Sequence, residues 1–111
     1  MKKQIFSLLM LLQAADGITV KFDVKSPVLT NVVLVYHMSV NEYALTDGKA
    51  TVQLDGMDAL YANVYYGEKF KIVYLQKGDD MTISFDANDF DNTFAVKGGN
   101  EKAVDYLNKI Q

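Results

Sequence analysis

The sequence predicts an all-β protein: an antiparallel immunoglobulin-like β-sandwich of seven to eight strands, followed by a short C-terminal helix. The first observation is period-2 alternation, clearest where Ile18, Val20, Phe22 and Val24 share one side of an extended segment and polar residues share the other. The second is the spacing of turn residues, which recur about every ten positions and separate short strand-like runs. The third is that a helical pattern is found only at the C-terminal end. This combination favours a sandwich over a parallel sheet.

The middle of the chain contains five further predicted strands and two predicted hairpins. Residues 31–38 form a nearly continuous apolar run, which predicts a central strand covered on both faces. Asp47-Gly48 separates the strand-like runs 42–45 and 50–54, so these two are expected to pair as an antiparallel hairpin. Gly67-Glu68 separates runs 60–66 and 69–75 in the same way. After a Gly-Asp turn, residues 81–86 alternate again, and residues 94–97 form a short final strand that ends at Gly98-Gly99.

The last twelve residues, 100–111, predict a helix. Asn100 is a good N-cap, and the apolar side chains Ala103, Val104, Leu107 and Ile110 recur at helical spacing. A helix of this length is marginal alone in water, so its apolar stripe must pack on something. We expect it to pack on the sandwich; the alternative is a partner or a further domain.

Residues 1–15 predict a signal peptide, with two lysines, an eight-residue apolar run and a small-residue exit at Ala14-Ala15. The expected location is therefore the periplasm or cell envelope, with membrane contact only through this leader. The alternative is an N-terminal segment that packs on the domain. The expected organisation is residues 1–15 as leader, 16–99 as the sandwich, and 100–111 as a helix that could connect to an absent domain.

Composition excludes several classes of function. Eleven basic residues, all lysine, stand against fourteen acidic ones, giving a net charge of −3 and a pI near 4.9. An acidic chain without arginine is a poor match for a nucleic-acid backbone. The chain has no cysteine, so it cannot supply a thiolate nucleophile, a redox pair or a lipidated N-terminal cysteine.

Few residues are candidates for chemistry. His37 is the single histidine and stands on an apolar strand without a triad-like neighbour, so we interpret it as structural. Residues 86–92 resemble a calcium loop, but Phe90 replaces an oxygen ligand and an ordinary Asp/Asn turn explains them as well. No catalytic residue, metal site or cofactor is predicted.

Tyrosine offers the best candidate surface, because exposed tyrosines bind partners at little entropic cost. The candidate partner surface consists of Tyr61, Tyr65, Tyr66 and Tyr74. The competing interpretation is that half or more of these side chains are core residues or cross-strand pairs.

The chain also resembles a known family in a series of short segments. These are residues 43–50 (Tyr-Ala-Leu-Thr-Asp-Gly-Lys-Ala), the tyrosine-rich hairpin, residues 75–79, 83–85 and 96–100, and residues 106–108 (Tyr-Leu-Asn). Together they resemble the N-terminal β-domain, of unknown function, that precedes the thioredoxin-like domain in TlpA-like thiol:disulfide oxidoreductases of Bacteroidetes. In that family a Cys-x-x-Cys domain follows, whereas this chain has no cysteine.

The resemblance implies a non-catalytic accessory or interaction domain of the envelope, whose partner is a thioredoxin-like domain or another envelope protein. Two alternatives stay open. One is a stand-alone module that binds a small ligand or a glycan. The other is a sandwich that assembles through its strand edges or its apolar N-terminal segment.

Overall fold

The computed structural model describes residues 17–99 and 101–109 of the chain. The predicted leader, the proposed N-cap Asn100 and the last stripe residue Ile110 lie outside the described residues. Within them the order of elements is β1 (Ile18–Lys25), β2 (Asn31–Tyr36), β3 (Ser39–Ala44), β4 (Lys49–Leu54), β5 (Ala59–Tyr66), β6 (Lys69–Gln76), β7 (Asp80–Asp86), α2 (Phe90–Thr93), β8 (Ala95–Lys97) and α3 (Glu101–Lys109). None of the described helices has the length and apolar character that crossing a membrane requires.

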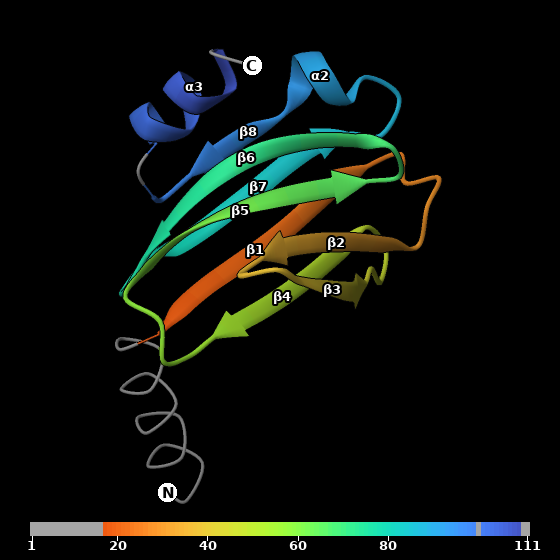
Figure 1. Cartoon of the computed structure of the whole chain (residues 1–111). Coiled ribbons are helices and arrows are strands. Elements are labelled where there is room, and N and C mark those ends of the chain that lie inside the picture. Colours follow the sequence, from red (N-terminus) through yellow and green to blue (C-terminus); the bar gives the residue numbers. More distant parts are fainter. Residues whose placement is uncertain (1–16, 100, 110–111) are drawn as a thin grey trace, which may run out of the picture.

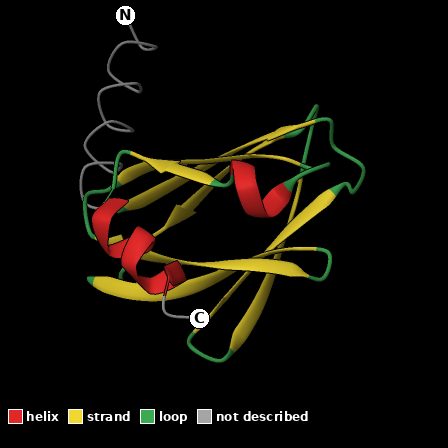
Figure 2. Ribbon diagram, turned by 90° about the horizontal axis from the view of Figure 1, so that it is seen from above, coloured by secondary structure: helices red, strands yellow, loops and turns green. Residues whose placement is uncertain are grey.

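The strands form two four-stranded sheets, so the predicted all-β sandwich with a short C-terminal helix is confirmed. One sheet has the order β4-β1-β7-β8 and the other β3-β2-β5-β6. Figure 2 shows the two layers face to face, with α3 across one side of the molecule. All neighbouring strands are antiparallel except β1 and β7, which pair in parallel from Thr19–Asp80 to Lys25–Asp86. Between β1 and β7 the chain enters the other sheet twice, as β2–β3 and as β5–β6, and returns in between as β4.

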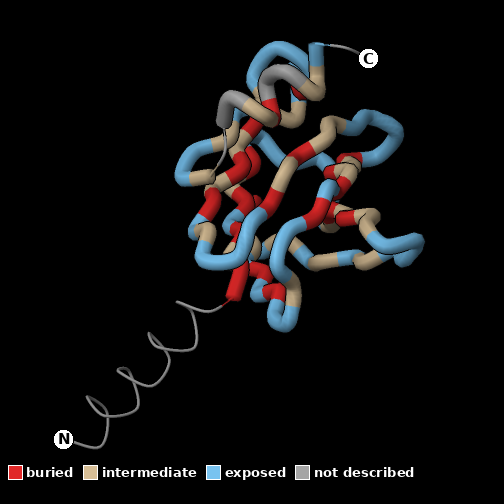
Figure 3. Tube along the Cα trace, turned by 60° about the vertical axis from the view of Figure 1, so that its left-hand side comes forward, coloured by how far each residue is buried: buried red, intermediate tan, exposed pale blue. Residues whose placement is uncertain are grey.

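The core fills the space between the sheets. Along β1 the buried positions are Ile18, Val20, Phe22 and Val24, as the alternation predicts, and the same period-2 pattern recurs on β5 and β7. Figure 3 shows buried positions alternating with exposed or half-buried ones along the strands. One end of the core is aromatic and consists of Tyr66, Phe85, Phe90 and Phe94. Phe90 belongs to the one-turn helix α2, which the sequence pattern does not predict.

Two hairpin predictions have different outcomes. The hairpin at Gly67-Glu68 forms as expected, with β5 and β6 paired along their full length. The antiparallel pairing of 42–45 with 50–54 is wrong: the turn forms, with Asp47 and Gly48 at positive φ and a bridge between Thr46 and Lys49, but the strands then diverge. β3 joins β2 and β4 joins β1, because the chain crosses here from one sheet to the other.

A tight turn that the sequence does not predict lies at His37-Met38. These two residues connect β2 and β3, and both have positive φ, 48° and 61°. Two-residue hairpin turns of this kind favour Asn-Gly, which tolerates positive φ at lower cost. The predicted single strand 31–38 is therefore a shorter strand, Asn31–Tyr36, followed by a turn.

Helix α3 packs on the sandwich, against β6 and β8 (Figure 1). Val104 is buried in the core cluster, and Ala103 and Leu107 are half-buried. The Asn108 side chain accepts a hydrogen bond from the backbone N–H of Ile72 (3.0 Å) and donates one to its carbonyl (2.9 Å). At Ile72 the Asn108 side chain thus makes the two backbone hydrogen bonds that a neighbouring strand would make with β6.

Candidate docking surface

The outer faces of the two sheets differ in chemistry. On the β4-β1-β7-β8 sheet the outward residues are polar: Thr19, Lys21, Asp23, Thr51, Gln53, Thr82 and Ser84. Lys21 forms an ion pair with Asp80 across this face, at 3.5 Å. Such a surface is the ordinary solvated side of a sandwich. We call it the polar face.

On the β3-β2-β5-β6 sheet the outward residues are mainly aromatic and aliphatic, and we call this surface the aromatic face. Its members are Val33, Val35, Val40, Tyr61, Asn63, Tyr65, Phe70, Ile72 and Tyr74, with Glu42 at its edge. Val40 is 73% exposed, Tyr61 62% and Phe70 39%. Contiguous apolar surface of this kind, rimmed by polar residues, marks interaction sites on soluble domains.

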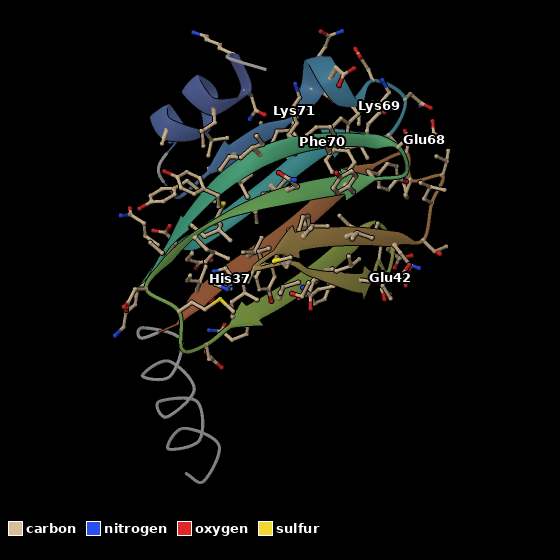
Figure 4. The ribbon with its side chains drawn as sticks, in the orientation of Figure 1. His37, Glu42, Glu68, Lys69, Phe70 and Lys71 are labelled. Carbon is tan, nitrogen blue, oxygen red and sulfur yellow. The ribbon has the colours of Figure 1, made fainter. Side chains whose placement is uncertain are left out.

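Two cross-strand pairs organise the aromatic face. Tyr61 and Tyr74 are opposite each other on β5 and β6, with ring centroids 4.9 Å apart. Tyr65 and Phe70 stack at 5.1 Å, and the pair Asn63–Ile72 lies between the two aromatic pairs. The β5–β6 hairpin fixes this register, so the sheet itself holds the rings in place. Figure 4 shows Phe70 at the start of β6, near the β5–β6 turn.

The structure therefore brings together three of the four tyrosines that the sequence singles out, and Tyr66 is the exception. Tyr66 is only 6% exposed and faces the core, because it differs in parity from Tyr61 and Tyr65 on the same strand. Its hydroxyl accepts hydrogen bonds from the N–H groups of Val28 (3.0 Å) and Leu29 (2.7 Å) and donates to the Leu29 carbonyl (3.2 Å). Its assignment to a partner surface is wrong; it holds the β1–β2 loop.

The apolar run on β2 contributes side chains to both sides of its sheet. Val32 and Leu34 are fully buried, whereas Val33 and Val35 are half-buried on the outer side. Among the residues that the structure describes, no element forms a second layer over Val33 and Val35, so the expectation of cover on both faces is wrong. The run is continuous because β2 contributes apolar residues to the core and to the exposed face.

Charges lie around the aromatic face, with Glu42 at its β3 edge. Lys69, at the start of β6, pairs with Asp91 of α2 at 3.0 Å. The hydrogen bond from Lys69 lowers the pKa of the Asp91 carboxyl below its ordinary value. At the opposite edge Glu42 accepts a hydrogen bond from the Asn31 side chain at 2.8 Å. Figure 4 shows Glu42 on β3 and Glu68 at the β5–β6 turn.

A shallow hollow of about 450 Å³ lies where β3 and β4 diverge, away from the paired tyrosines. Its walls are Tyr43, Ala44, Thr46, Lys49, Ala50 and Thr51. Partial burial, and then the neighbouring Tyr36, raise the pKa of Tyr43 above its ordinary value. No carboxylate or histidine contributes to these walls.

The other candidates from the sequence have structural surroundings. His37 is exposed at the β2–β3 turn, with its ring edge-to-face with that of Tyr36 at 5.6 Å. In the 86–92 segment the Asp86 carboxylate accepts a hydrogen bond from the Asn88 N–H, and Phe90 is buried. Within residues 17–99 and 101–109, no group of three His, Cys, Asp or Glu side chains is placed to hold a metal ion.

Phe70 and Val40 were missed by the sequence reasoning. The signal for Phe70 was available, because in a hairpin that turns at Gly67-Glu68 it is opposite Tyr65. Comparison of the chain with protein families, with curated proteins and with solved structures found no match.

Proposed function

We propose that this protein is a non-catalytic interaction domain of the cell envelope, and that it binds a protein partner on its aromatic face. The observation that supports this most strongly is the contrast between the two outer faces of one sandwich. One face alternates as a solvated sheet should, whereas the other exposes two ordered aromatic pairs and four aliphatic side chains. Enrichment in aromatic side chains is a property of the centres of protein interfaces.

The partner we propose is a thioredoxin-like domain or another envelope protein, in keeping with the family that the sequence resembles. The aromatic face carries few charges and mainly aromatic and aliphatic side chains, which suits a folded protein surface more than a small charged ligand. Asn63, between the two aromatic pairs, provides an amide that can both donate and accept hydrogen bonds at the centre of the contact.

The alternative of a small-ligand module has less support. A small ligand needs a concave site that buries most of its surface. The hollow between β3 and β4 contains none of the paired aromatics of β5 and β6. A glycan could still stack on the tyrosine rings, and the experiment below separates this case from a protein partner.

Photo-cross-linking in the native envelope tests the proposal. A benzophenone amino acid replaces Tyr61 on the aromatic face or, as the matched control, Thr82 on the polar face. We expect a discrete protein adduct from position 61 that is absent from position 82, with the partner identified by mass spectrometry. Adducts with glycan alone, or the same protein adducts from both positions, would contradict a protein-docking aromatic face.

A further inference from the structure

We infer that the free edge of β3 binds an extended segment of a partner polypeptide as an added strand, and that this segment places a basic residue opposite Glu42. This inference goes beyond the aromatic face, because an edge is recognised through backbone hydrogen bonds and a face through side chains. Either one can fail while the other holds.

The first step of the argument is that the two edges of this sheet differ. At the β6 edge the Asn108 amide makes both backbone hydrogen bonds of Ile72, and α3 packs alongside. At the other edge β3 is the last strand of its sheet, and no described strand lies beyond it. Natural sheets protect edges with charged side chains, especially lysine, with proline or with a covering element. β3, with the sequence Ser-Val-Asn-Glu-Tyr-Ala, has neither lysine nor proline, and its one charge is that of Glu42.

The second step is that β3 presents an ordered set of backbone donors and acceptors. The Leu45 N–H donates a hydrogen bond to the Thr30 carbonyl at 2.7 Å. Every second residue before Leu45, such as Tyr43, therefore directs its backbone N–H and C=O groups toward β2. Backbone groups of an antiparallel strand alternate in direction. The N–H and C=O groups of Val40, Glu42 and Ala44 are therefore directed away from β2, toward the position of a next strand.

The third step is that both sides of an added strand would find suitable surroundings. Side chains on its outer side would continue the aromatic face beyond Val40, which is 73% exposed. Side chains on its inner side would cover the hollow between β3 and β4, whose walls include the inward-facing Tyr43 and Ala50. Small apolar residues would fit there, at the positions that alternate with the outer ones.

The fourth step is that the charge of Glu42 determines which kind of strand can pair with the β3 edge. Glu42 is the only charged residue of β3, and Asn31 holds its carboxylate on the outer side. A second copy could pair with β3 in an antiparallel arrangement. The outward backbone groups of Val40, Glu42 and Ala44 would then place the Glu42 of the second copy either opposite Glu42 or diagonal to it. The two carboxylates would repel each other in both registers. A lysine or arginine opposite Glu42 would instead be attracted. The charge pattern therefore favours a basic extended segment over self-pairing.

The probe for this site is the capped heptapeptide Ser-Val-Ala-Lys-Ala-Val-Ser, titrated into the full-length protein and followed by amide chemical shifts in NMR. We expect the largest shifts at Val40, Glu42 and Ala44. Two N-methylated peptides provide a matched pair. Methylation of both valine amides removes hydrogen bonds to β3 and should weaken binding by about ten-fold or more, whereas methylation of both alanine amides, which face away, should not.

Charge variants complete the test. Glu42→Lys should weaken binding of the lysine peptide by about three-fold or more, and should favour the same peptide with glutamate at its centre. Glu68→Lys, the same charge change at the β5–β6 turn, should leave both peptides unaffected. Equal binding of the two methylated peptides, absence of shifts at the β3 amides, or equal effects of the two lysine variants would overturn the inference. A protein dimer whose β3 amides are protected without peptide would show that the occupant is a second copy, and would overturn it too.

Discussion

The side-chain amide of Asn108 on α3 makes two hydrogen bonds to the backbone of Ile72, one to its N–H at 3.0 Å and one to its carbonyl at 2.9 Å. A third bond, from the Asn108 Nδ2 to the Val104 carbonyl at 3.0 Å, orients the amide on its own helix. This arrangement fixes α3 to the β6 edge and satisfies polar groups that an uncovered edge would leave to water. It is the clearest reason why the helix belongs to the sandwich.

Replacement of Asn108 by alanine should therefore destabilise the protein. We expect a loss of about 1 to 2 kcal/mol in the free energy of unfolding, because the partly buried N–H and C=O of Ile72 lose their partners. Urea denaturation measures the change from the midpoint at constant slope. Lys109→Ala, at the exposed neighbouring position, is the control and should change stability by less than about 0.5 kcal/mol. Equal midpoints for the two variants would show that the amide does not hold the helix.

The Tyr66 hydroxyl should also contribute to stability. Tyr66→Phe keeps the buried ring but leaves the N–H groups of Val28 and Leu29 without their acceptor, at a cost of about 1 to 2 kcal/mol. Tyr61→Phe, on the exposed aromatic face, removes a hydroxyl without such bonds and should be nearly neutral. Thermal or urea unfolding of the two variants separates a structural tyrosine from a surface one. A neutral Tyr66→Phe would refute the role of this hydroxyl in holding the β1–β2 loop.

The β2–β3 turn should be open to stabilisation. His37 and Met38 both have positive φ, a conformation that costs a non-glycine residue energy. The double change His37→Asn and Met38→Gly supplies the residues that this turn type favours, and should raise stability by about 0.5 to 2 kcal/mol. The same measurement on Ser39→Gly, in an exposed strand position beside the turn, should show no gain. Destabilisation by the double change would mean that His37 or Met38 makes a contact that outweighs the turn strain.

Tyr43 should make stability fall at alkaline pH. Its pKa is raised in the folded state, chiefly by burial, above the ordinary value of 10.0. Its stabilising contribution is thus fully present below the ordinary value and is lost as pH rises through the raised one, because the unfolded chain releases the proton first. The difference in unfolding free energy between the wild type and Tyr43→Phe should shrink over that range. A difference that stays constant with pH would show that the hydroxyl is not perturbed.

The sequence was most informative where the physics is local. The alternation in β1, the glycine turn between β5 and β6 and the helical stripe around Val104 each depend on near neighbours, and each formed as expected. The Asp47-Gly48 turn also formed, but a turn does not determine where its strands go next. That choice depends on which sheet buries Val52 and Leu54, and this is a long-range property.

The candidate surface could be predicted only in part for the same reason. Tyr61, Tyr65 and Tyr74 lie on the outer side of the sheet and Tyr66 does not, because strand parity relative to the core decides which side chains face out. The apolar residues of β2 were attributed to burial on both faces. Composition alone cannot distinguish a doubly covered strand from one that carries apolar residues on an outer face as well.

The most direct test of the account is the affinity of the cross-linked partner for two matched variants. Tyr61→Ser combined with Tyr74→Ser removes one aromatic pair from the aromatic face, and Thr51→Ala combined with Thr82→Ala changes the polar face. Calorimetric titration should show that the tyrosine variant binds about ten-fold or more weaker, because aromatic residues at the centre of an interface carry most of its energy. The threonine variant should bind as the wild type does. Equal affinities for the two variants, with both proteins folded, would contradict the claim that this protein acts through its aromatic face.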